Sequence, residues 1–104
     1  MRQFGPGELA AYLQQQQPVL LDVREPWEFN ICHIPGSQLI PMGQIPARLD
    51  DLDPQQEIVL ICHHGIRSRQ VGMYLEHQGF NRLINLSGGV DAWAREVDHA
   101  MPTY

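Results

Sequence analysis

The chain has 104 residues and a formal net charge of −5, from 7 basic residues, all of them arginine, and 12 acidic ones. This length is typical of one small domain, which we expect to span residues 1–104. A hydrophobic share of 43% is ordinary and excludes a disordered or fibrous class. The arginines are scattered and form no basic stripe, so we expect no nucleic-acid partner.

No apolar run approaches the roughly 20 residues that a membrane-spanning helix needs, because the longest are Val19–Leu21 and Ile58–Cys62. The first residues are not followed by a signal-like apolar stretch. We therefore predict a cytoplasmic protein without a membrane partner. Two cysteines, Cys32 and Cys62, are too few for a disulfide framework, and a reducing compartment would keep Cys62 available.

Apolar spacing and turn residues predict alternating helices and strands along the whole chain. In chain order, we expect a helix over about 7–16, a strand over 19–23, a helical turn over 26–31, a strand around 38–40, a short helix over 46–52, a strand over 57–61, a helix over 68–78, a strand over 83–86 and a final helix from 90. Gly79 is placed to cap the helix that precedes it. This alternation predicts the α/β class, with a largely parallel sheet covered on both faces.

The strongest functional signal is the segment from Ile58 to Ser68, in which a buried strand leads into a loop that starts with Cys62. Ligands of parallel sheets bind beyond the carboxyl ends of the strands, where Cys62 is expected. Unpaired amides and the dipole of the following helix, together with Arg67, favour an ionised sulfur. Gly65 allows the loop to turn tightly. Cys62 is therefore our candidate nucleophile.

The length of this loop indicates what it can hold. Four residues separate Cys62 from Arg67, one fewer than in phosphatase loops that wrap the oxygens of a phosphoryl group. We expect six residues of backbone to surround one extra sulfur atom bonded to Cys62, but to crowd a tetrahedral phosphate. A small phosphatase or an arsenate reductase is accordingly the less favoured alternative.

On these residues the chain resembles the rhodanese family of sulfurtransferases, whose active loop reads Cys-x-x-Gly-x-Arg-Ser/Thr and is matched here by Cys62, Gly65, Arg67 and Ser68. Residues 21–37 are similar to the family's first signature, an Asp-Val-Arg strand end followed by His-Ile-Pro-Gly-Ser. Residues 85–93 are similar to its second, a Gly-Gly turn before a helix with a tryptophan. One departure is Cys32, because the family usually has glycine before the histidine.

The resemblance implies a three-layer α/β/α, rhodanese-like fold with about five mainly parallel strands and helices on both faces. It also implies a sulfurtransferase that moves a sulfane sulfur from thiosulfate or a similar donor through a persulfide on Cys62. The expected substrate-binding residues are the rest of the loop: His63, His64, Gly65, Ile66, Arg67 and Ser68. No cofactor is implied.

The expected partners are a small anionic sulfur donor and a thiol, cyanide or thioredoxin-like acceptor. Residues 92–104 are similar to the ends of rhodanese domains fused to enzymes that activate sulfur-carrier proteins. An alternative function is therefore a persulfide relay that feeds a sulfur-carrier protein, or the thiolation of a cofactor or tRNA.

Two further alternatives are a non-catalytic interaction module and a redox sensor in which Cys32 resolves an oxidised Cys62. The presence of Cys62 and Arg67 disfavours the first. For the second, the two sulfurs must approach closely, and we interpret Cys32 as a packing or surface residue in a turn without a nearby arginine. We expect no metal site, because no Cys-x-x-Cys or His-x-x-x-His spacing is present.

The charged residues around the loop also have structural interpretations. Asp22, Arg24 and Glu25 are predicted to form ion pairs, and the Arg67 guanidinium is predicted to tie the loop to a carboxylate such as Asp22 or Glu25. His63 and His64 are interpreted as recognition residues, because sulfur transfer between anions needs no general base. We interpret Gly88 and Gly89 as a turn that lets two backbones approach closely.

Overall fold

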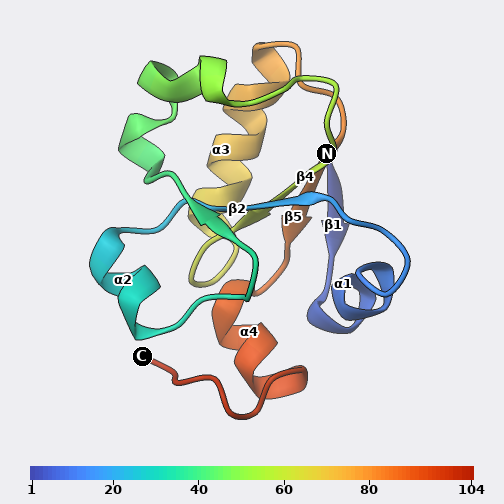
Figure 1. Ribbon diagram of the computed structural model, residues 1–104, viewed down its shortest axis with the longest axis vertical. Helices are drawn as coiled ribbons and strands as arrows, with labels where there is room; N and C mark the ends of the chain where they lie inside the picture. The colour runs from blue at the N-terminus through green and yellow to red at the C-terminus, as the bar shows by residue number, and fades with distance from the viewer.

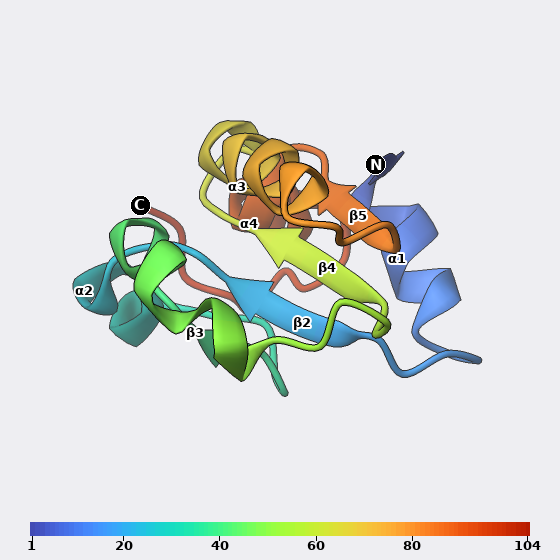
Figure 2. The same ribbon diagram turned by 90° about the horizontal axis from the view of Figure 1, so that it is seen from above.

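The computed structural model describes residues 1–104, and a five-stranded sheet in which every neighbouring pair is parallel lies at its centre. The strand order is β1-β5-β4-β2-β3. Figure 2 shows the arrows of β2, β4 and β5 side by side and pointing the same way. The strands are β1 (Arg2–Phe4), β2 (Val19–Asp22), β3 (Gln38–Leu39), β4 (Ile58–Ile61) and β5 (Leu83–Leu86).

The three central strands are short and mostly apolar, and they are covered on both faces of the sheet. Every residue of β4 and of β5 is buried, which is the pattern expected of parallel strands covered on two sides. Because successive side chains point to opposite faces, Val59 and Ile61 join one core cluster while Ile58 and Leu60 join the other. The sheet thus separates two hydrophobic layers.

Helices cover both faces of this sheet (Figure 1). One core layer contains Leu9 with Val90 and Trp93, from the first and last helices, and the other contains Val71 and Leu75 from the third. The α-helices are α1 (Pro6–Tyr12), α2 (Pro26–Ile31), α3 (Ile66–His77) and α4 (Gly89–Glu96), and the 3₁₀ helices are η1 (Met42–Gln44) and η2 (Pro46–Asp51). The predicted α/β class and three-layer arrangement are confirmed. None of the helices has the length and apolar composition that crossing a bilayer requires.

Most predicted elements are confirmed, with shifts at their ends. The last strand has its predicted bounds, whereas the first helix ends at Tyr12 and not near residue 16, and α3 starts at Ile66, two residues before its predicted start. Gly79, with φ of +94°, follows α3, and its amide donates to the carbonyl of Glu76. The sequence analysis missed β1 and η1, because three residues give too little periodicity to indicate either.

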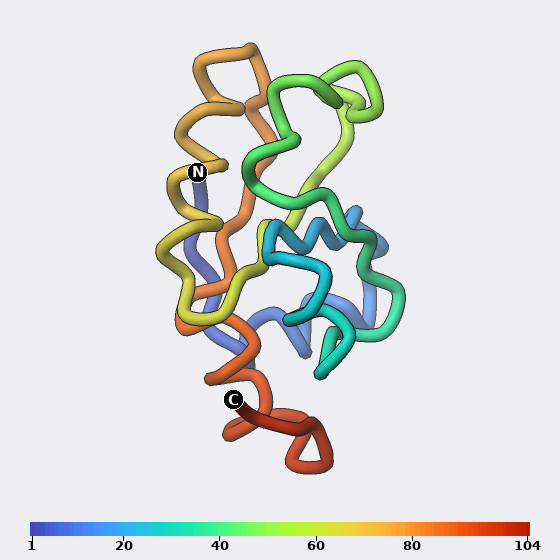
Figure 3. Tube along the Cα trace, turned by 90° about the vertical axis from the view of Figure 1, so that its left-hand side faces the viewer, coloured from blue at the N-terminus to red at the C-terminus, as the bar shows by residue number.

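Both ends of the chain pack against the rest of the domain. The first strand, β1, pairs with β5 at one edge of the sheet, where Gln3 lies opposite Asn85. Beyond α4 the chain loops out and turns back (Figure 3), and the C-terminal end lies near α2 (Figure 1). Residues far apart in the sequence can therefore meet at the carboxyl edge of the sheet.

Candidate active site

Cys62 directly follows β4, so it lies at the carboxyl edge of the sheet, as predicted from the parallel topology. The neighbouring strands β2 and β5 end at the same edge, at Asp22 and Leu86. The segment Cys62–Arg67, called the active loop below, joins β4 to the first turn of α3.

The sulfur of Cys62 is enclosed, since the residue is only 1% exposed. The amide of Gly65 donates a hydrogen bond to Cys62 Sγ at 3.0 Å, and Ser68 Oγ lies 3.2 Å from the same sulfur. Several other amides here donate to no carbonyl or side chain of the protein, namely those of His63, His64, Ile66 and Arg67 in the loop and that of Ser68, which follows it. Free amides at the start of a helix form an environment that favours a bound anion.

Glycines let the turn before α4 approach the active loop closely. Gly65 has φ of +93°, and a Cβ there would lie 3.0 Å from the amide nitrogen of Gly88. A Cβ on Gly89 would overlap the carbonyl oxygens of Cys62 and His63. Those two carbonyls accept hydrogen bonds from the amides of Val90 and Asp91 at 2.9 and 3.1 Å, so the first turn of α4 holds the loop backbone in place.

Arg67 is fixed by Glu28 of α2. The two guanidinium nitrogens donate to the two carboxylate oxygens at 2.7 and 2.8 Å, and the Glu28 side chain is almost completely buried. The hydrogen bonds from Arg67 lower the pKa of Glu28 to about 2, against the opposing effect of burial. The same pair raises the pKa of Arg67.

A carboxylate therefore holds Arg67, as predicted, but it is Glu28 and not one of the two named examples, Asp22 and Glu25. Asp22 is occupied by the buried Arg24, whose guanidinium donates to both of its carboxylate oxygens, and this ion pair was predicted. Glu25 forms no ion pair. Its side chain is exposed at the residue that precedes α2, and its backbone amide donates to the carboxylate of Glu28. Helical spacing places Glu28 one turn further on, with its carboxylate facing the active loop.

Tyr104 belongs to the site and the sequence analysis did not predict it. Its hydroxyl donates to Glu28 Oε2 at 2.7 Å and accepts from Arg24 Nη1 at 2.8 Å. Its ring stacks on His63, with centroids 3.9 Å apart and an interplanar angle of 6°. Burial, with the hydrogen bond to Glu28, raises the pKa of Tyr104 to about 12, so the phenol stays protonated at neutral pH. No local pattern could indicate the hydrogen bonds of Tyr104, because they span 76 and 80 residues of sequence.

The two histidines of the active loop lie at its outer side. Their rings are 4.0 Å apart, and His64 Nδ1 is 3.9 Å from a carboxylate oxygen of Asp91. Burial, with the neighbouring His64, lowers the pKa of His63, so that ring is neutral at neutral pH. A neutral imidazole stacked on Tyr104 contributes shape and hydrogen-bonding groups without a fixed charge.

Cys32 is buried in packing, but the interpretation that no arginine lies nearby is wrong. Arg24 donates to the carbonyl oxygen of Cys32 at 2.6 Å, and its Nη1 lies 4.0 Å from the sulfur. Cys32 and Cys62 are both free thiols and belong to the two different core clusters on opposite faces of the sheet. This arrangement disfavours a disulfide between them.

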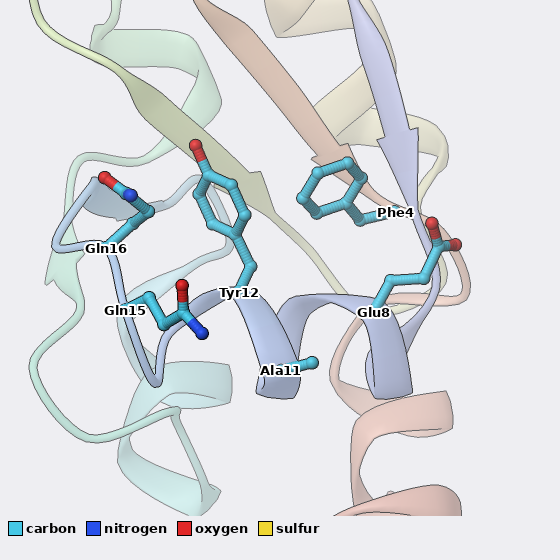
Figure 4. Close-up of a pocket in the computed structure, with 6 residues that line it drawn as sticks. All are labelled: Phe4, Glu8, Ala11, Tyr12, Gln15 and Gln16. Carbon is cyan, nitrogen blue, oxygen red and sulfur yellow. The ribbon is translucent and has the colours of Figure 1, made fainter.

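The largest pocket lies elsewhere, on α1, and no residue of the active loop lines it. Figure 4 shows Tyr12 and Phe4 projecting from α1 and β1 at this pocket, which has a volume of about 470 Å³. Its lining residues are Phe4, Glu8, Ala11, Tyr12, Gln15 and Gln16. Neither cysteine lines this pocket, so size alone does not identify the site.

Comparison with known proteins agrees with this geometry. A family model described as a rhodanese-like domain matches residues 5–96, and the chain belongs to that family. A sulfurtransferase of Allochromatium vinosum is 39% identical over 84 residues, which are 81% of this chain and 76% of that protein. A rhodanese-like domain protein from Staphylococcus aureus has a crystal structure with a TM-score of 0.84 and 32% identity, covering 100% of this chain and 99% of that one.

Another relative is much longer than this chain. The Arabidopsis thaliana protein named rhodanese-like/PpiC domain-containing protein 12, chloroplastic, is 38% identical over 89 residues, but the match spans only 30% of its length. The shared domain is therefore used within larger proteins as well.

Replacing Gly89 should disrupt the active loop. We expect Gly89→Ala to lower the free energy of unfolding by at least about 2 kcal/mol more than Gly79→Ala, because only the former puts a Cβ against loop carbonyls. Gly79→Ala is the matched control, since φ is also positive there but nothing lies within 4 Å of the added Cβ. Urea denaturation measures both, and equal losses would contradict the proposed close approach.

The ion pair between Arg67 and Glu28 should make stability depend on pH in the acid range. The native pKa of Glu28 is lowered from 4.5 to about 2, so its stabilisation is present above pH 4.5 and is lost as the pH falls towards 2. We expect Glu28→Gln to be less stable than the native chain by up to about 3 kcal/mol at neutral pH, and this difference to shrink over that range. Denaturant unfolding of both proteins at several pH values between 7 and 2 measures this difference in stability. A difference that stays constant with pH would contradict the role given to the ion pair.

Proposed function

We propose that this protein is a sulfurtransferase that carries a sulfane sulfur as a persulfide on Cys62. The observation that carries the proposal is the environment of this one sulfur. It is enclosed, receives a hydrogen bond from the Gly65 amide, and lies in a loop whose other amides are free. The relative named as a sulfurtransferase supports this class of activity.

In the first step, the Cys62 thiolate attacks the outer sulfur of a donor such as thiosulfate. A bond forms between the two sulfurs, the bond to the sulfonate sulfur breaks, and its electron pair leaves with sulfite. The transferred sulfur remains on Cys62 as a persulfide, which at neutral pH carries the negative charge. No oxidant or reductant enters this step.

The active loop would stabilise that charge. Free amides near Cys62 are fixed by the backbone before the donor arrives, so they need no reorganisation when charge moves onto the outer sulfur. The guanidinium of Arg67 contributes positive potential to the loop. Its two terminal nitrogens stay bonded to Glu28, so Arg67 also holds the loop in position. His63, His64 and the exposed Ile66 would contact the donor or the acceptor at the loop surface.

In the second step, an acceptor anion attacks the outer sulfur of the persulfide and regenerates the Cys62 thiolate. With cyanide the product is thiocyanate, and with a thiolate it is a new persulfide. A thioredoxin-like dithiol would react in the same way. Neither step moves a proton from carbon, so no side chain is required as a general base.

A mass measurement tests the persulfide directly. We expect the native chain, incubated with thiosulfate or another sulfane donor, to gain the mass of one sulfur atom, and to lose it on treatment with cyanide or a reductant. Intact-protein mass spectrometry detects both changes.

Two single substitutions complete that experiment. Cys62→Ser should abolish the added mass, whereas Cys32→Ser is the matched control and should retain it, because Cys32 packs on the opposite face of the sheet. Absence of the adduct with every sulfane donor tested would refute the proposal. Loss of transfer in Cys32→Ser would instead favour the two-cysteine redox alternative.

A further inference from the structure

A buried polar cluster lies directly beneath the active loop and links Cys62 to β5 and β1. Ser68 is completely buried and Asn85 is 2% exposed, although Asn85 lies in the middle of an otherwise apolar strand. Ser68 Oγ lies 2.5 Å from Asn85 Oδ1 and 3.2 Å from Cys62 Sγ. The single hydroxyl of Ser68 therefore has two neighbours that can accept its proton.

The donors and acceptors of this cluster define where that proton lies. Asn85 Nδ2 donates to the carbonyl oxygen of Gly65 at 3.1 Å and to Gln3 Oε1 at 2.9 Å. Because the Gly65 carbonyl can only accept, the amide nitrogen of Asn85 must face it, and the amide oxygen must face Ser68. An amide oxygen can only accept too, so the Ser68 hydroxyl donates its one proton to Asn85.

This geometry leaves Ser68 Oγ as an acceptor towards Cys62. Since the Ser68 proton lies on the side of Asn85, the 3.2 Å contact between Ser68 Oγ and Cys62 Sγ can be a hydrogen bond only while the sulfur carries a proton to donate. An ionised sulfur, by contrast, gains from Ser68 only if the hydroxyl rotates away from Asn85, which leaves a buried amide oxygen without a donor.

We propose that Asn85 is a positioning residue that competes with the Cys62 sulfur for the Ser68 proton and so restrains ionisation of the nucleophile. When Cys62 ionises, its proton passes to buffer, the bond from Ser68 to Asn85 breaks and a bond from Ser68 to the sulfur forms. No electrons are gained or lost. The consequence for sulfur transfer rests on the proposed function, but the competition itself does not.

Several other charged or titratable groups lie around Cys62. Arg67 is the cation whose charge couples to the sulfur, and Glu28 neutralises it from α2. Facing the loop from the neighbouring elements are Asp22, which is paired with Arg24, Asp91 at the start of α4, and the loop residues His63 and His64. None of them forms a hydrogen bond with Asn85 or Ser68.

Alkylation with iodoacetamide as a function of pH tests the competition. The thiolate displaces iodide, and peptide mass spectrometry separates Cys62 from Cys32. Burial of Cys62 slows the reaction in the native chain and in the variants alike, so the difference between their midpoints is the quantity compared. In Asn85→Leu, which keeps the branched shape of the side chain but has no polar atom, we expect this midpoint to fall by about one pH unit, because Ser68 is free to donate to the sulfur.

Two comparisons exclude general damage. Asn85→Asp retains an oxygen facing Ser68, so its midpoint should not fall although it loses the same two hydrogen bonds to Gly65 and Gln3. In a Ser68→Ala background, Asn85→Leu should leave the midpoint unchanged, because the contested proton is gone. Asn85→Ala, which adds no bulk, replaces the leucine variant if that one does not fold.

The proposal would be overturned if Asn85→Leu lowered the pH midpoint of alkylation equally in the native and Ser68→Ala backgrounds. It would also be overturned if Asn85→Leu raised that midpoint. The reaction involves no sulfane sulfur, so its outcome is independent of the persulfide experiment. A chain that forms no persulfide could still show the competition, and a chain that forms one could lack it.

Discussion

The geometry of the active loop depends on its backbone contact with the turn before α4. Carbonyl groups of Cys62 and His63 accept hydrogen bonds from the first amides of α4, and this is possible only because Gly89 has no side chain to separate the two segments. While these two carbonyls face α4, the amides of His63, His64, Ile66 and Arg67 have no acceptor within the protein. The same contact therefore fixes the loop and creates the environment in which a sulfur anion is stabilised.

A second set of contacts holds the outer side of the loop and consists of charges and an aromatic ring. Arg67 is bound by Glu28, and the hydroxyl of Tyr104 joins Glu28 to the buried pair of Arg24 and Asp22. Each of these buried charges has a partner, which is what makes their burial tolerable. Because Arg67 is held by a carboxylate, it supplies potential from a fixed position and does not move freely towards the donor.

The sequence predicts the parts of this structure that follow from local patterns. Apolar runs and glycines indicated the central strands, the start of the active loop and the close approach at Gly88 and Gly89. The predicted examples of a carboxylate partner for Arg67 were wrong because Asp22, Glu25 and Glu28 lie close together in the sequence. Only the helical turn of α2 directs one of them, Glu28, towards Arg67. The contacts of Tyr104 and of Gln3 depend on how the chain ends return to the sheet, which no short pattern encodes.

A nucleophile that must remain available has to satisfy two opposing requirements. The charged form of Cys62 needs donors nearby, and the Gly65 amide and the free loop amides provide them. A sulfur ionised at all times would also react with any oxidant that reaches it. Asn85 acts in the opposite sense to the amides, since it holds the one side-chain proton that the sulfur could use. A buried asparagine in an apolar strand weakens packing, and this competition gives a physical reason for its presence.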